Sequence, residues 1–100
     1  MNQIEKIQYM EQILNRASEV MADFEKALEN YTAVQVQLQE LSEYYGSEEW
    51  FRDFDDDNAG KFPRNLRRGV LSEDAIYNLL SDNRRLLEQM QEVSKDGMMK

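Results

Sequence analysis

An apolar stripe with a helical period runs through residues 2–45, and no glycine or proline interrupts it. With Ile7 at heptad position a, ten of the twelve a and d positions are apolar or aromatic, which is typical of an amphipathic helix. The five g positions from Ile13 to Leu41 are apolar as well, so this face is wider than a coiled-coil seam and suits a helix that contacts two neighbours. The pattern predicts one long helix over residues 2–45.

Residues that typically end or begin helices divide the middle of the chain into a short helix and a loop. Gly46 follows the last periodic residue, where a left-handed C-terminal cap is expected. Ser47 is a suitable N-cap for a short helix over residues 48–56. Pro63 favours an extended conformation at the residue before it, and residues 57–71 are therefore predicted to form an irregular loop.

A second long helix is predicted over residues 73–95. Ser72 is its expected N-cap, and Leu71 with Ile76 forms the apolar pair that staples such a helix start. Asn83 interrupts the apolar stripe of this helix. A polar residue in that position more often fixes the register of a helical interface than it binds a ligand.

These elements predict an all-α fold, a single domain over residues 1–100. In it the long N-terminal helix and the shorter C-terminal helix form an antiparallel hairpin, with the short helix and the loop at the turn. At 1.5 Å per residue the two long helices measure about 65 Å and about 35 Å. The second can therefore cover only the half of the first that lies nearest the turn.

The uncovered half predicts self-association. A bare apolar stripe of this length is unusual on a soluble monomer, which favours a homodimer that pairs the N-terminal halves as in a coiled coil or a four-helix arrangement. The expected self-association residues are Ile7, Met10, Leu14, Ala17 and Met21. A first helix that bends or breaks, so that the chain closes as a monomeric bundle, is the alternative.

The composition excludes several kinds of chemistry. The chain has no cysteine and no histidine, so it can form neither disulfides nor thiolate or imidazole metal sites. It also lacks the commonest general base, a glycine-rich phosphate loop and a nucleophile elbow. We therefore expect a protein that is not an enzyme and has no cofactor, no metal and no small-molecule substrate.

A net charge of −8 opposes direct binding to nucleic acid and to anionic membrane surfaces. No apolar run approaches the roughly 20 residues of a membrane span, and the first ten residues do not resemble a signal peptide. With the lack of cysteine, these features predict a cytoplasmic protein.

An acidic segment lies directly before a basic one in the middle of the chain. Residues 46–60 carry six acids and one base, whereas residues 61–71 carry four bases and no acid. In an EF-hand register that starts at Asp55, Ala59 stands at position 5 and Leu66 at position 12, where calcium needs oxygen ligands. An internal cluster of salt bridges is therefore favoured over a calcium loop, and also over phosphate binding by the basic loop.

Aromatic residues are concentrated between positions 44 and 62, which hold six of the ten. A small core at the turn, completed by Leu66, Val70 and Leu71, is the favoured interpretation. A partner-binding surface is the alternative, because aromatic residues dominate interface hot spots. The candidate partner-binding residues are Tyr44, Tyr45, Trp50, Phe51, Asp53, Asp55, Asp56, Asp57, Arg64, Arg67 and Arg68.

Three stretches carry a resemblance to a known family: the opening MNQIEKIQYMEQIL, then LSEYYGSEEWFRDF and GKFPRNLRRGVLSEDAIYNLL. They resemble a family of short bacterial proteins classed as a domain of unknown function, over nearly the whole chain. The resemblance implies a bacterial origin and a helical fold, and it transfers no site residue. The run of acids over residues 53–57 is heavier than the family leads us to expect.

Three functions stay open at this point. The favoured one is a self-associating helical module that binds an unidentified protein partner near residues 44–71. The second is an acidic mimic of nucleic acid that inhibits a nucleic-acid-binding protein, as mobile-element inhibitors do, and its binding would weaken steeply with salt. The third is a metal-dependent switch at residues 53–57, which would gain stability with calcium.

Overall fold

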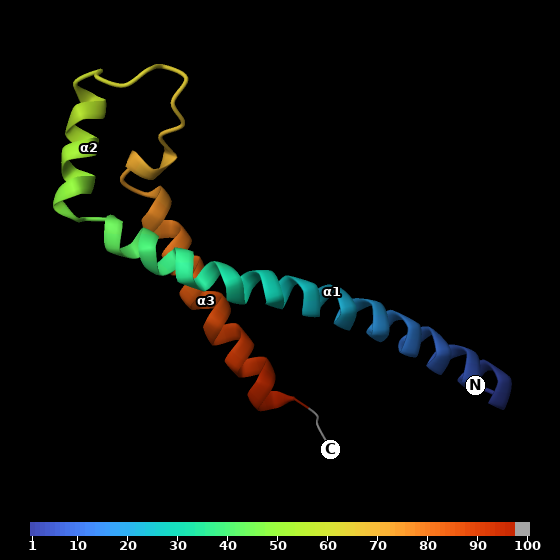
Figure 1. Ribbon diagram of the computed structural model, residues 1–100. Helices are drawn as coiled ribbons and strands as arrows, with labels where there is room; N and C mark the ends of the chain where they lie inside the picture. The colour runs from blue at the N-terminus through green and yellow to red at the C-terminus, as the bar shows by residue number, and fades with distance from the viewer. Residues whose placement is uncertain (98–100) are drawn as a thin grey trace. The chain divides into compact units, whose positions relative to one another are not determined.

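The computed structural model describes residues 1–97, and these form an all-α structure without a strand. Three α-helices follow one another along the chain, with a short 3-10 helix before the last (Figure 1). Their bounds are α1 Gln3–Tyr44, α2 Glu48–Asn58, η1 Gly69–Leu71 and α3 Ala75–Asp96. The predicted fold class and the order of a long, a short and a C-terminal helix are confirmed. The antiparallel packing of the two long helices stays a prediction.

The chain divides into two compact units, Met1–Gln37 and a second that starts at Leu38. The first unit is a single helix, the first 35 residues of α1. The second holds the end of α1 together with α2, η1 and α3. None of the described helices is both long enough and apolar enough to cross a membrane.

α1 is continuous from Gln3 to Tyr44, so the alternative of a first helix broken into two is not found. The side chain of Asn2 accepts a hydrogen bond from the backbone N–H of Glu5 at 2.8 Å, as an N-cap residue does. At the other end Gly46 has φ +80°, a left-handed conformation that suits glycine. The predicted boundaries of this helix therefore agree with the structure to within one residue.

α2 begins as predicted and ends two residues later than predicted. The Ser47 hydroxyl accepts from the Trp50 backbone N–H at 3.1 Å and donates to the Tyr44 carbonyl at 2.6 Å, so one side chain serves the ends of both helices. The helix continues to Asn58, and the turn follows at Gly60, which has a left-handed φ of +74°. Residues 57 and 58 are thus helical and not part of the loop.

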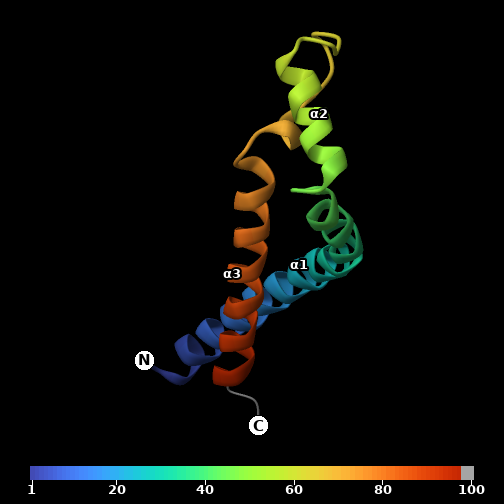
Figure 2. The ribbon, with the colours of Figure 1, turned by 90° about the vertical axis from the view of Figure 1, so that its left-hand side faces the viewer.

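The predicted loop is also shorter at its other end. Gly69–Leu71 is a 3-10 helix, and α3 begins at Ala75, two residues later than predicted. The residue that precedes α3 is Asp74, whose side chain makes no capping bond, so Ser72 is not its N-cap as predicted, although the Ser72 hydroxyl accepts from the Ala75 backbone N–H at 3.1 Å. In both views η1 lies beside α2 at the end of the returning loop (Figures 1 and 2).

The buried core of the described residues consists of Trp50, Leu71 and Ile76, all in the second unit. Their side chains are 5%, 7% and 2% exposed. The small core predicted at the turn is therefore present, and both residues of the predicted staple belong to it. Leu66 and Val70 were expected there as well, but they stay 46% and 43% exposed: Leu66 lies on the surface loop between α2 and η1, and Val70 lies in η1, where only Leu71 is buried.

Candidate functional site

Trp50 is the centre of an aromatic cluster in the second unit. Its ring centroid lies 5.3 Å from that of Tyr45 and 5.1 Å from that of Phe51, and both of these rings meet it edge to face. Phe54, one helical turn further along α2, stacks on it at 5.2 Å with an interplanar angle of 22°. These are the favoured geometries of aromatic pairs, so the four rings form a preorganised group.

Two long-range hydrogen bonds hold the returning chain against this cluster. The Trp50 indole N–H donates to the Val70 carbonyl at 2.9 Å, and the Tyr45 hydroxyl donates to the Glu73 carbonyl, also at 2.9 Å. The first bond satisfies the polar atom of a buried indole. The second fixes the backbone of Glu73 next to the Tyr45 ring, and so places an acidic residue beside the aromatic cluster.

An open hollow of about 440 Å³ lies over this cluster. Its lining residues are Tyr45, Gly46, Trp50, Phe51, Phe54, Asp55 and Glu73. Phe51 is 54% exposed, so one aromatic side chain at the hollow is accessible to a partner although Trp50 is not. We refer to these seven residues as the aromatic hollow.

Two carboxylates of the aromatic hollow have no ion-pair partner in the described part of the chain. Among residues 1–97, Asp55 and Glu73 form no salt bridge, and both residues are exposed. Of the other three acids of residues 53–57, Asp56 and Asp57 each pair with a cation, and Asp53 accepts a hydrogen bond from the neutral Tyr44 hydroxyl. The aromatic hollow is therefore negatively charged as well as aromatic.

Asp53 accepts a hydrogen bond from the Tyr44 hydroxyl at 2.7 Å. Partial burial of the phenol, together with this bond and the charge of Asp53, raises the pKa of Tyr44 from 10.0 to about 12. All three causes favour the neutral phenol, because a tyrosinate would be poorly solvated and would lie against a carboxylate. The bond ties α2 to the end of α1.

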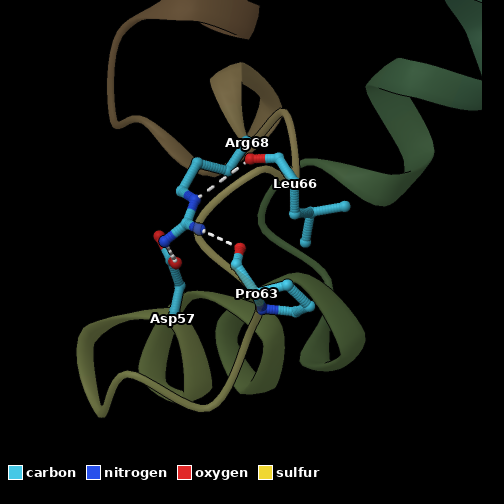
Figure 3. A network of polar contacts seen from close by, with 4 residues as sticks. All are labelled: Asp57, Pro63, Leu66 and Arg68. Atoms are coloured by element: carbon cyan, nitrogen blue, oxygen red, sulfur yellow. Dashed lines mark hydrogen bonds and ion pairs between the residues drawn. The ribbon is translucent and has the colours of Figure 1, made fainter.

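Arg68 fastens the loop to α2, as the close view shows (Figure 3). Its guanidinium forms an ion pair with Asp57 at 2.6 Å. It also donates to the carbonyl of Pro63 at 2.6 Å and, more weakly, to that of Leu66 at 3.4 Å. One planar side chain thus bonds to three acceptor groups in the second unit. We therefore expect it to contribute more to the free energy of unfolding than a simple surface ion pair does.

The predicted salt-bridge cluster is present only in part. Lys61 pairs with Asp56 at 3.1 Å and Arg68 with Asp57, but Arg64 and Arg67 are exposed and belong to no ion pair of the described residues. No group of three or more carboxylates within residues 1–97 is arranged to hold a metal ion.

The structure thus separates the candidate residues into groups with different environments. Tyr45, Trp50, Phe51 and Asp55 line the aromatic hollow. The others brace the turn or lie on the loop surface. Sequence reasoning did not include Glu73 in the site, because it was assigned to the first turn of a helix. No local pattern signals the bond that brings it 28 positions back to Tyr45.

The candidate self-association residues lie on α1, within the first unit. Ile7, Leu14 and Met21 are 56%, 58% and 70% exposed, and Met10 is exposed as well, whereas Ala17 is partly covered. No residue of α1 is buried. The helix therefore carries its apolar face without burying any part of it fully.

A comparison with protein families identifies the chain's relatives. The model of the family described as a domain of unknown function (DUF4298) matches residues 7–93. The chain belongs to this family. The predicted family resemblance is thereby confirmed; DUF4298 is a domain of unknown function, and the described residues of this member are helical. No curated protein and no solved structure matches the chain.

Proposed function

We propose that this DUF4298 protein is a non-catalytic helical interaction module, which self-associates through α1 and binds a partner protein at the turn between α1 and α2. One observation carries the self-association: the apolar face of a 42-residue helix has no buried residue. Helices in water gain most of their stability by packing such a face, and large exposed apolar patches mark association sites.

A second copy of the chain fits this face best. The apolar residues recur at a and d positions over several heptads, and the same periodicity on a second copy is complementary to it. The a/d/g width of the face allows each helix more than one neighbour. A homodimer therefore covers the stripe without any further element.

The aromatic hollow supports the partner-binding part of the proposal. It combines an accessible ring, Phe51, with rigid neighbours and two carboxylates that form no ion pair within residues 1–97. Preorganised aromatic side chains lose little conformational entropy on binding. The lack of histidine and cysteine in the chain agrees with a role in binding and not in catalysis.

The acidic-mimic alternative has less support. Mimicry of a phosphate backbone needs carboxylates that are free and spaced along an exposed face. Three of the four acids over residues 53–57 are instead bonded to Tyr44, Lys61 and Arg68. The two ion pairs, Asp56 with Lys61 and Asp57 with Arg68, partly neutralise the acidic run, and we therefore do not favour this function.

The mass in solution tests self-association. Light scattering across a dilution series should give twice the 11.9 kDa of one chain at high concentration. The variants Ile7→Glu and Leu14→Glu should shift the equilibrium towards the monomer by about 100-fold or more, because each places an unpaired charge in the apolar interface.

Val36→Glu is the matched control. Val36 is 69% exposed and lies at heptad position b, outside the apolar face, so this variant should keep the mass of the unmodified protein. A mass of 11.9 kDa at every concentration would overturn the self-association proposal.

A further inference from the structure

The aromatic hollow has the composition of a site for an organic cation. The faces of its aromatic rings are electron-rich and attract cations, and the carboxylates of Asp55 and Glu73 add full negative charge at its edge. Neither carboxylate belongs to an ion pair in the described part of the chain. The hollow thus presents rings and charges that no cationic side chain of residues 38–97 pairs with.

We propose that the aromatic hollow binds the guanidinium group of an arginine side chain in the partner protein. The inference rests on the proposed role of the turn in partner binding, and it specifies the chemistry of that partner. The guanidinium lies against the exposed ring of Phe51 and is paired by Asp55 and Glu73. The partner surface is therefore basic around this arginine.

Charge complementarity decides against an apolar occupant. An apolar side chain would exclude water from two carboxylates without providing a counter-charge, and uncompensated desolvation of charges is unfavourable. A cation removes this cost because it pairs with them. The neighbouring acids Glu48 and Glu49 also form no salt bridge within residues 1–97, so the surrounding field favours approach of a basic segment.

Geometry favours arginine over lysine. The guanidinium is planar, stacks on aromatic faces and donates to carboxylates through a rigid fork, whereas an ammonium is a strongly hydrated point charge. The hollow is open and broad, at about 440 Å³, so a flat group with its aliphatic stem can lie along the rings. Arginine is also among the residues enriched at interface hot spots.

The test uses the full chain labelled with ¹⁵N and titrated with a short peptide, acetyl-Gly-Gly-Arg-Gly-Gly-amide. Trp50 is the only tryptophan, so its indole N–H gives a single signal at the hollow, and the Gly46 amide gives a second. Both should shift and saturate. The peptide with citrulline for arginine, which has the same shape without the charge, should bind about tenfold more weakly, and the lysine peptide more weakly than the arginine peptide.

Variants of the hollow assign the site. Asp55→Asn and Glu73→Gln keep size and remove one charge each, and each should weaken binding of the arginine peptide about threefold. Phe51→Leu keeps an apolar side chain and removes the ring, with a similar expected loss. Glu88→Gln, which removes an acid on α3 that does not line the hollow, is the matched control and should bind as the unmodified chain does.

Several outcomes would overturn the inference. Equal binding of the arginine and citrulline peptides would show that charge plays no part, although the turn would remain a docking surface. The lack of any shift up to about 10 mM peptide would show that the hollow takes no arginine. A shift of the Trp50 signal on diluting the protein alone would identify a second copy as the occupant, through its Arg64 or Arg67, and not a separate partner.

Failure of this inference is distinguishable from failure of self-association. The mass in solution reports on the face of α1 and the peptide titration on the aromatic hollow. A monomer that binds the arginine peptide would overturn only the self-association proposal. A dimer with no preference for arginine over citrulline would overturn only the proposed arginine site.

Discussion

Arg68 shows how much of the turn depends on one side chain. Its guanidinium pairs with Asp57 on α2 while it donates to the carbonyls of Pro63 and Leu66 in the loop. The loop has no helix or strand of its own between Lys61 and Arg68, so these bonds replace the backbone ladder that regular structure would supply. A single charged group thereby sets the path of the irregular segment.

We predict that Arg68→Ala lowers the free energy of unfolding by about 1–3 kcal/mol, because it removes the cation that pairs with Asp57 and the guanidinium bonds to the Pro63 and Leu66 carbonyls. Chemical denaturation followed by circular dichroism measures this loss. Arg68→Lys should recover only part of it, since an ammonium cannot reach the same three acceptors. Arg67→Ala, at an exposed neighbouring arginine without an ion pair in the described chain, is the control. An equal loss of unfolding free energy in Arg68→Ala and Arg67→Ala would contradict the role given to the bonds of Arg68.

The raised pKa of Tyr44 makes a contribution to stability that depends on pH. A group whose pKa is higher in the folded state stabilises that state below its unfolded pKa, and the contribution disappears as pH rises through the folded value. For Tyr44 these values are 10.0 and about 12. The stabilisation should therefore be complete below about pH 10 and be lost between pH 10 and pH 12.

We predict that Tyr44→Phe reduces the free energy of unfolding by about 1–2 kcal/mol at pH 8, through loss of the bond to Asp53. The difference from the unmodified protein should shrink towards pH 12. Denaturation at a series of pH values measures it, with Tyr9→Phe on α1 as the control for removal of a phenol. A difference that stayed constant up to pH 12 would show that the Tyr44 hydroxyl is not the titrating group.

At the scale of elements, the connection between α1 and α2 depends on a left-handed residue. Gly46 has φ +80°, and a Cβ added there would meet no atom within 4 Å. The only cost of a side chain at this position is therefore the backbone conformation itself, which disfavours residues with a Cβ by roughly 1 kcal/mol. Gly69 offers a comparison, since it has equal space and no positive φ.

We predict that Gly46→Ala lowers the free energy of unfolding by about 1 kcal/mol, whereas Gly69→Ala changes it by less than about 0.5 kcal/mol or raises it slightly. Thermal and chemical denaturation of the two variants measure the difference. Because both substitutions add one methyl group in open space, a similar effect of the two would rule out backbone conformation as the cause.

Local signals predicted the helices well and the loop boundaries less well. The heptad pattern over residues 2–45 and the cap Ser47 depend on neighbours in sequence, so α1 and the start of α2 could be read directly. The start of α3 was placed two residues too early, and the carbonyl of Glu73, which lies before the helix, accepts a hydrogen bond from the hydroxyl of Tyr45. That bond spans 28 positions, and no periodicity reports it.

The candidate site was predictable in the same uneven way. The density of aromatic residues indicated the cluster around Trp50, because such residues pack together wherever they are close in the chain. The sequence did not indicate which acids of residues 53–57 form ion pairs and which do not. Asp57 pairs with Arg68 while Asp55 remains without an ion pair in the described chain, and this distinction depends on the path of the loop, which the sequence leaves undetermined.

At the scale of the whole molecule, the two units differ in what stabilises them. The unit from Leu38 onward contains all three buried residues of the described chain, whereas residues 1–37 form one helix without a buried residue. In proteins most of the stability of a helix comes from packing its apolar face against other elements and not from helix propensity. If the proposed dimer covers the apolar face of this helix, helix formation in the first unit is coupled to association.

This coupling gives a prediction that the mass alone does not test. Dilution through the dissociation range should lower the helical signal at 222 nm and the Tm together, because binding a second copy stabilises only the folded helix. Leu14→Glu should show the lower helicity at every concentration, and Val36→Glu should follow the unmodified protein. If helicity instead stays constant while the dimer dissociates, α1 is stable without a partner. Its apolar face would then serve association alone and contribute nothing to the folding of the chain.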